Sequence, residues 1–305
     1  MTASPRVTIG LPVYNAEKFL AVALDSILAQ TYADFVLIIS DNGSTDRTAE
    51  ICHAYCARDQ RIRYFCNEKN LGAAPNFNRV FALASTEYFK WAPYDDLLAP
   101  EFLARCVEIL DQHPTVVLCY SRAEIIDEQG NYVVDYDPGP ATNSRKPAER
   151  FRNLILHPEY AIQQMGVMRS AVLKQTVLHG SYPSSDEVLL AELALRGEFY
   201  EIPDRLYLYR RHGEQSTSVN QQRARIIFFD TAMTRKITLP KWMYLFAGLG
   251  VIQRVPLDWR ARGSGYLTMA RWVFILPHLR ALIKDVLIAL SQIIARVARG
   301  GRMSE

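Results

Sequence analysis

Two adjacent carboxylates, Asp95 and Asp96, lie where a predicted strand ends and a predicted helix begins. The strand is the aromatic run 88–91, and the helix opens at Pro100. Two ionised acids on one short loop repel each other, and a divalent cation such as Mg²⁺ or Mn²⁺, which prefers oxygen ligands, removes that repulsion. Such a cation can also bind the phosphates of a substrate. The alternative is that one acid only caps the helix, since Asp is a favoured N-cap residue.

Polar residues follow two other predicted strands in the same way. Tyr14 and Asn15 follow the run 7–12, and Asp41 and Asn42 follow the run 35–39. In sheets of parallel strands, ligands bind beyond the carboxyl ends of the strands. We therefore expect these four residues and the acid pair to line one site.

A further acid, Asp186, stands at the start of a helix predicted to end at Gly197. On local evidence alone this residue reads as an N-cap, because a short carboxylate accepts hydrogen bonds from the first backbone N–H groups of a helix. The other interpretation is a carboxylate that takes part in chemistry.

The usual glycine-rich phosphate loops are absent. No GxGxxG follows the first predicted strand, and no GxxxxGK[ST] occurs anywhere in the chain. A diphosphate bound here would need another counter-charge. A cation at Asp95 and Asp96 would supply it.

Strands and helices alternate over the first 120 residues, which predicts an α/β fold with a doubly wound, mostly parallel sheet. The pattern then changes to a hairpin, two helices with a strand between them, the helix of Asp186 and a last strand. The predicted strands are 7–12, 35–39, 62–66, 88–91, 116–120, 123–126, 132–134, 164–168 and 207–211, and the predicted helices are 19–27, 48–56, 76–84, 101–111, 151–156, 171–178 and 188–197.

The 305 residues suggest one α/β domain over residues 1–220 and a helical C-terminal region over residues 221–305. Five cysteines without CxxC spacing indicate reduced thiols in a cytoplasmic protein. The N-terminus has no apolar run typical of a signal peptide, and no stretch of about 20 apolar residues predicts a membrane-spanning helix.

The net charge of +3 conceals a strong asymmetry. Residues 221–305 carry 14 basic and 4 acidic residues, whereas the remainder carries 21 basic and 28 acidic ones. Apolar residues recur at steps of three and four from Leu279 to Val297, with basic residues beside them, as in helices that lie on anionic membranes. The alternative is that this stripe packs on the catalytic domain or pairs with a second protomer. The stripe is too apolar for nucleic-acid binding.

Several segments, in this order along the chain, resemble glycosyltransferase family 2, the inverting enzymes with the nucleotide-diphospho-sugar transferase (GT-A) fold. They span about residues 5–218 and include Gly72, Asn78 and Asp186. The segments are Thr8 to Asn15, Ile39 to Asp46, Asn70-Leu71-Gly72 with Asn78, Asp95-Asp96, Asp186 with its helix, and Tyr209 to His212.

The resemblance implies a nucleotide-sugar site. In the family's pattern, Pro12, Tyr14, Asn15 and Asp41 correspond to residues that hold the base and ribose of the donor. The remaining donor-binding residues that we expect from the resemblance and the strand ends are Asn42, Gly72, Asn78, Asp95 and Arg211. Phe77 stands where many members have Arg.

The resemblance also implies a metal and a base. Asp95 matches the last acid of the family's Asp-x-Asp motif and Asp96 the acid that commonly follows, whereas Pro93 replaces the first acid. Either Mg²⁺ or Mn²⁺ is expected there, with His212 as a further candidate ligand, unless Arg211 and His212 are only a solvated basic strand end. Asp186 matches the catalytic base.

The expected function is inverting transfer of a sugar from a nucleotide-diphospho-sugar, a UDP-sugar foremost, to a hydroxyl of a glycan or lipid-linked acceptor in the synthesis of surface polysaccharide, lipopolysaccharide or glycolipid. The Gln-x-x-Arg-Trp motif of processive members is absent, which favours single additions. The protein would work in the cytoplasm or at the inner face of the plasma membrane. The alternative is a non-catalytic nucleotide-sugar-binding or membrane-associated scaffold protein with a degenerate metal site.

Overall fold

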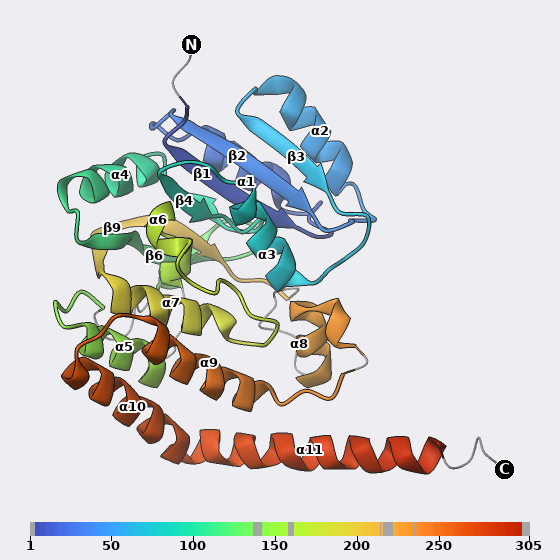
Figure 1. The fold of residues 1–305 in the computed structure, drawn as a ribbon. Helices are drawn as coiled ribbons and strands as arrows, with labels where there is room; N and C mark the ends of the chain where they lie inside the picture. Colours follow the sequence, from blue (N-terminus) through green and yellow to red (C-terminus); the bar gives the residue numbers. More distant parts are fainter. Residues whose placement is uncertain are drawn as a thin grey trace.

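The structure, a computed structural model, describes residues 4–136, 142–157, 162–213, 215, 222–234 and 236–300, without the side chains of 222–223 and 295–300. The expected boundary between residues 220 and 221 lies outside the described residues. A single sheet runs through the N-terminal part of the chain, and helices form the C-terminal part (Figure 1).

Four parallel strands form the first part of the sheet, in the order β3-β2-β1-β4. They are β1 (Val7–Val13), β2 (Phe35–Asp41), β3 (Ile62–Cys66) and β4 (Tyr88–Trp91). Strand β1 pairs with both β2 and β4, so the chain reverses its direction of winding at β1. The predicted doubly wound sheet is confirmed, and its switch point lies at the β1 and β4 ends.

The rest of the sheet is mixed. It continues as β4-β8-β6-β9-β5, with β7 on β6. Strands β6 and β9 pair in parallel over their length, whereas β8 is antiparallel to both of its neighbours. These strands are β5 (Leu97–Leu98), β6 (Val116–Ile126), β7 (Tyr132–Asp135), β8 (Val167–Arg169) and β9 (Glu198–Arg210).

Helices cover both faces of the sheet because buried parallel strands are apolar on both sides. One face packs against α1 (Leu20–Leu28), α2 (Thr48–Arg58) and α4 (Phe102–Gln112). The other packs against α3 (Ala73–Ala82), α6 (Ser170–Leu173) and α7 (Ser185–Arg196).

The C-terminal helices share a third hydrophobic core with α7 and α5 (Pro147–Leu156). Helices α9 (Pro240–Arg254) and α10 (Trp259–Phe274) pack there, and α11 (Leu276–Gly300) continues along the lower edge of the molecule (Figure 1). Helix α8 (Gln222–Phe229) contacts α3 instead. Helix α7 therefore packs against the sheet on one side and against the C-terminal helices on the other.

Several predicted elements differ in the structure, and the strands predicted over 116–120 and 123–126 are one continuous strand, β6. The helix predicted over 171–178 ends at Leu173, and Leu178 has a φ of 57°, which a continuous helix cannot accommodate. The strand predicted over 164–168 is a 3₁₀ turn, Ile162–Met165, followed by β8. The strand predicted over 207–211 is the end of β9, which is longer because it pairs with β6 from residue 198 onward.

Candidate active site

The first acid of the pair, Asp95, lies on the loop between β4 and β5 and meets His212 from the end of β9. His212 Nε2 and Asp95 Oδ2 form a side-chain hydrogen bond of 2.9 Å. The side chain of His212 is 1% exposed and that of Asp95 is 15% exposed. The fold thus brings together two of the residues that the sequence analysis selected as metal ligands.

The donor set of this pair fits a divalent metal. Carboxylate oxygen suits Mn²⁺, and imidazole nitrogen is a common ligand of divalent transition metals in proteins. Neighbouring ligands in an octahedral shell with bonds of about 2.1 Å lie about 3 Å apart. The spacing of Asp95 and His212 has this size, and two protein ligands leave positions for phosphate oxygens and water.

Arg210, which the sequence analysis did not select, fixes this loop. Its Nε donates to the carbonyl of Asp95 at 2.8 Å, and its Nη1 donates to the carbonyls of Asp127 and Glu128 at 3.0 and 2.9 Å. Arg210 is buried, whereas its neighbour Arg211 has an exposed side chain. Adjacent side chains of an extended segment point to opposite faces, so the pairing of β9 with β6 decides which of the two arginines is buried.

Asp96 turns away from Asp95. Its Oδ1 accepts from the backbone N–H of Arg210 at 2.8 Å, and its other oxygen accepts from the hydroxyl of Tyr207. Burial, and then the neighbouring Asp95, raise the pKa of Asp96. This geometry favours a role in holding the loop, and metal binding by Asp96 stays a prediction.

The capping alternative for the acid pair is wrong. Helix α4 begins at Phe102 with Glu101 as its N-cap residue, and no side chain caps it. Strand β5 lies between the acids and the helix because Leu97 and Leu98 pair with β9. Asp95 and Asp96 therefore belong to the exit of β4.

The loops after β1 and β2 are bound to each other. Asn15, at a φ of 48°, donates its backbone N–H to Ser44 Oγ at 2.9 Å and accepts from the N–H of Thr45 at 2.9 Å. Asp41 is buried, and its two oxygens accept from the N–H of Ser44 at 2.8 Å and from the hydroxyl of Tyr64 at 2.7 Å. These contacts hold the ends of β1 and β2 against each other.

Two other expected donor-binding residues, one within β1 and one just after it, differ in exposure. Tyr14 is 41% exposed, so its ring is open to a ligand, whereas Pro12 lies within β1 opposite Ser40. A flat exposed ring suits a nucleoside, whose base needs a stacking face.

Asn42, Gly72 and Asn78 take part in the protein's own contacts. Asn42 Nδ2 donates to the carbonyl of Gly72 at 3.1 Å, and its Oδ1 accepts from the N–H of Leu71 at 3.0 Å. Asn78 exchanges two hydrogen bonds with the backbone of His179, at 2.9 and 3.0 Å. Their geometry indicates that they shape the loops, and direct contact with a donor stays a prediction.

Asp186 lies in the first turn of α7, whose N-cap residue is Ser184 at a φ of 65°. The alternative that Asp186 is the N-cap of this helix is therefore wrong. Burial raises the pKa of Asp186, while backbone N–H groups at the helix start and the charge of Arg225 on α8 act in the opposite direction. A carboxylate with a raised pKa suits proton transfer near neutral pH.

His179 seats the loop before α7 against the end of β4. Its ring lies 4.9 Å from that of Trp91, and its Nε2 is 3.2 Å from Gln164 Nε2. Burial lowers the pKa of His179 to about 3, so the ring is neutral at physiological pH. Through Trp91 and His179, the loop that leads to Asp186 packs against the strand that leads to Asp95.

The comparisons with known proteins identify the family of this chain. The sequence profile described as Glycosyl transferase family 2 matches residues 8–176, which is more than half of the chain. The chain belongs to glycosyltransferase family 2. The match includes both acids of the β4 exit loop but ends before Asp186.

Several curated relatives carry the name glycosyltransferase. An uncharacterized glycosyltransferase of Haemophilus influenzae is 26% identical over 72% of this chain and 69% of its own length. Uncharacterized glycosyltransferases of Rickettsia typhi and Methanocaldococcus jannaschii are 33% and 31% identical over 48% and 44% of this chain. The match spans 45% and 47% of the length of those two proteins.

Solved structures confirm the GT-A fold of this glycosyltransferase. The S. aureus TarS 1-349 complex with UDP-GlcNAc has a TM-score of 0.55 at 17% identity, over 88% of each chain. The mannosyltransferase PcManGT from Pyrobaculum calidifontis, in complex with GDP-Man and Mn²⁺, has a TM-score of 0.51 at 17% identity, over 95% of this chain and 87% of that one.

A buried lysine of this glycosyltransferase lies behind the acid loop. Lys90 Nζ donates to the carbonyl of Trp91 at 3.1 Å and to that of Met165, and it lies 4.6 Å from the ring centre of Phe102. Burial lowers the pKa of Lys90 to about 7, although the charge of Asp96 raises it. The sequence analysis did not select Lys90, although a lysine within the aromatic run 88–91 was a signal that could have indicated it.

The C-terminal region covers one of the expected donor loops. Thr231 donates its N–H to the carbonyl of Leu71 at 3.2 Å and its hydroxyl to that of Asn70 at 3.0 Å. Gly72 has a φ of +96°, and a Cβ there would lie 2.6 Å from the Cα of Asp230. No local sequence signal predicts these contacts.

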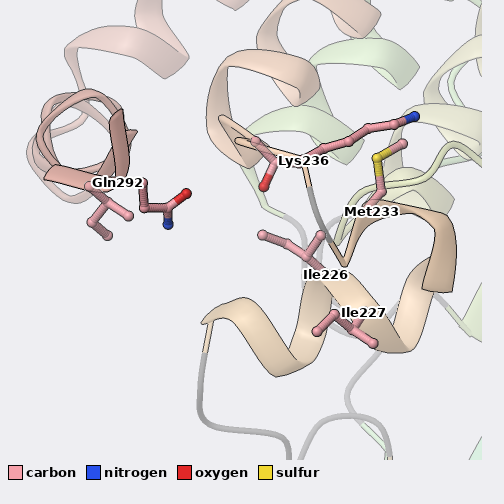
Figure 2. Close-up of a pocket in the computed structure, with 7 residues that line it drawn as sticks. Ile226, Ile227, Met233, Lys236 and Gln292 are labelled. Carbon is pink, nitrogen blue, oxygen red and sulfur yellow. The ribbon is translucent and has the colours of Figure 1, made fainter. Parts of the chain in front are cut away.

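A groove of about 160 Å³ lies elsewhere, between α8 and α11 (Figure 2). Ile226 and Ile227 form its α8 side, and Gln292 stands on the opposite wall. It contains none of the expected site residues, so we do not assign the donor to it. Within the described ranges, no group of three or more His, Cys, Asp or Glu side chains forms a metal site, and no helix is long and apolar enough to span a membrane.

Proposed function

We propose that this chain transfers a sugar from a nucleotide-diphospho-sugar, a UDP-sugar foremost, to an acceptor hydroxyl in one displacement that inverts the anomeric centre. The acceptor would be a glycan or a lipid-linked glycan of a cell-surface polysaccharide, lipopolysaccharide or glycolipid. Residues 1–220 would carry the reaction in the cytoplasm or at the inner face of the plasma membrane. The UDP-GlcNAc and GDP-Man complexes of structures with this fold support such a donor.

The observation that carries this proposal is the pair of Asp95 and His212, 2.9 Å apart. These two residues would hold Mg²⁺ or Mn²⁺, which neutralises the charge that develops on the departing nucleoside diphosphate. Arg210 keeps the pair in place through its bond to the Asp95 carbonyl. The exposed Arg211 would contact the diphosphate from the same strand end.

Asp186 would act as the base. It would accept the proton of the acceptor hydroxyl while the oxygen attacks the anomeric carbon from the face opposite to the diphosphate. The raised pKa of Asp186 keeps its basicity useful near neutral pH. A protein that only binds nucleotide sugars has no need of such a group.

The base and ribose would lie on the floor made by the loops after β1 and β2. Tyr14 offers its exposed ring, and Asp41 and Asn15 hold the strand ends beneath it by accepting from Ser44 and Thr45. Pro12 supports that floor from within β1, and Asn42, Gly72 and Asn78 shape the loops beside it.

A panel of UDP- and GDP-sugars tests the proposal. Purified protein is incubated with each sugar and with Mn²⁺, Mg²⁺ or a chelator, and release of the nucleoside diphosphate is measured with and without glycan acceptors. We expect one donor to be consumed with a divalent cation, and NMR of the product to show an inverted anomeric configuration. Binding without turnover of any donor would favour the scaffold alternative, and a retained configuration would refute the single displacement.

A further inference from the structure

Helices α10 and α11 leave a row of large apolar side chains uncovered. On α10, Trp259 and Phe274 are each 77% exposed, and on α11, Leu287 and Ile294 are 60% and 68% exposed. The remaining exposed apolar members of this row are Tyr266, Leu267, Ile275, Leu276, Ile283, Val286, Leu290 and Ile293. A soluble surface seldom collects so many large apolar side chains on two consecutive helices.

The opposite sides of the same helices pack on the protein. On α11, Leu282, Asp285 and Ala289 are buried, and Asp285 accepts from the backbone N–H of Lys241 at 2.7 Å. On α10, Met269 and Trp272 are buried, and the Trp272 ring stacks on that of Tyr244 at 4.9 Å. Packing on the catalytic part therefore uses one side of each helix, and the exposed row belongs to the other.

The groove of Figure 2 agrees with this division. Ile288 and Gln292 of α11 line it toward α8. Residues in a helix advance by about 100° each, so Leu290 points about 160° away from Gln292 and Ile288 points about 100° away from Leu287. The part of the row on α11 consequently faces away from the groove and from the body of the molecule that lies above α11 in Figure 1.

Cations border the exposed row. Between residues 259 and 294 the sequence has five basic residues and a single acid, Asp285, which is buried. The exposed basic residues of this stretch are Arg260, Arg271, Arg280 and Lys284. An apolar row edged by Arg and Lys, without exposed acids between them, complements a surface with anionic headgroups and an acyl interior.

We infer that α10 and α11 lie flat on an anionic lipid bilayer, with the row from Trp259 to Ile294 inserted at the level of the headgroups. This inference concerns a surface and does not rest on the transfer reaction. Large apolar side chains would supply the partition free energy, and the bordering cations would make binding depend on anionic lipid and on salt.

Vesicle flotation of the full-length protein tests the inference. We expect the protein to float with vesicles that contain phosphatidylglycerol, to float poorly with pure phosphatidylcholine, and to be released by high salt. The double variant Leu287→Glu/Ile294→Glu should lower the partition coefficient by about tenfold or more, because it places two charges in the row. Thermal unfolding and nucleotide-sugar binding, measured in parallel, should not change.

A matched control separates the row from a general effect of charge. Val133 on β7 and Val177 between α6 and α7 are each 51% exposed, so Val133→Glu/Val177→Glu adds the same charge away from α10 and α11. This control should float like the unmodified protein. Equal flotation with and without anionic lipid, equal flotation of both double variants, or no flotation at all would overturn the inference.

A second copy of the chain is the competing occupant, and light scattering in the absence of lipid identifies it. A monomer supports the lipid surface. A dimer that dissociates in Leu287→Glu/Ile294→Glu would assign the row to self-association and overturn the inference.

Discussion

Asp95 and His212 are 117 residues apart in the sequence, yet His212 Nε2 lies 2.9 Å from Asp95 Oδ2. Strand β9 makes this contact possible because it pairs with both β6 and β5 and so ends beside the β4 exit loop. An imidazole from a distant strand thus lies beside Asp95, on the loop where Pro93 stands in place of the first acid of the family's Asp-x-Asp motif. This relationship makes His212 a candidate ligand as well as a neighbour of the acid.

His212→Ala should weaken Mn²⁺ activation of transfer. Loss of one of two protein ligands should raise the Mn²⁺ concentration for half-maximal activity by about 10- to 100-fold, with little change at saturating metal. The measurement is the metal dependence of nucleoside diphosphate release. His157→Ala, at an exposed position, is the control. An unchanged metal requirement in the His212 variant would remove His212 from the site.

Asp186→Asn should abolish most transfer. General-base assistance is typically worth about 10²- to 10⁴-fold, so the turnover rate should fall by that factor while donor affinity stays within about twofold. Glu187→Gln removes a carboxylate at the next position and should retain transfer. Equal losses of affinity and turnover in Asp186→Asn would mean that the residue supports the structure instead.

The pH profile of transfer should respond to Arg225. The charge of Arg225 lowers the pKa of Asp186, and a base works only when it is ionised. In Arg225→Ala the pKa of Asp186 should rise, so the acidic limb of the kcat/KM profile should move to higher pH. Arg63→Ala, an exposed cation on β3, should leave the profile in place. A shift to lower pH would contradict the assignment of Asp186 as the base.

The sequence predicted much of the first half of the fold. Strands 62–66 and 88–91 were placed to the residue, and the polar strand ends were expected at one edge of the sheet. Continuous apolar runs between polar loops carry this information locally. The resemblance of short motifs then indicated the family, which the profile match over residues 8–176 confirms.

The parts that could not be predicted depend on distant partners. Arg210 and Arg211 are adjacent and alike in sequence, and only pairing of β9 with β6 decides which one is buried. The hydroxyl of Thr231 bonds to Asn70 across 161 positions. Nothing in the motif around Gly72 indicates that Asp230 will lie against it.

Removal of the Asp96 side chain should lower the free energy of unfolding more than removal of an exposed acid does. Asp96→Ala leaves the buried hydroxyl of Tyr207 and the N–H of Arg210 without their acceptor, at a cost of about 1–3 kcal/mol in the free energy of unfolding. Urea denaturation measures this cost. Asp204→Ala, which removes an exposed partner of Arg105, should cost less than about 0.5 kcal/mol. A similar small cost for Asp96→Ala would leave the acid free for metal binding.

Glu187 should make the protein less stable as the pH rises toward neutrality. Burial, and then the charge of Asp186, raise the pKa of Glu187 from 4.5 to about 7, although Lys241 and Tyr244 of α9 lower it. Between these two values the unfolded chain has released the proton and the folded chain still holds it, so the free energy of unfolding falls as the pH rises from about 4.5 to about 7. The difference is worth up to about 3 kcal/mol, at 1.36 kcal/mol per pKa unit.

Glu187→Gln removes this titration. The unfolding free energy of this variant should fall less steeply between pH 5 and pH 7. At pH 7 its unfolding free energy should equal or exceed that of the unmodified protein. Thermal or urea unfolding at several pH values measures the slope. Glu50→Gln, at an exposed position on α2, controls for the loss of an acid and should leave the slope unchanged. Parallel plots of unfolding free energy against pH for Glu187→Gln and the unmodified protein would contradict this prediction. They would mean that Glu187 ionises normally in the folded chain and stays in contact with water where α9 packs against α7.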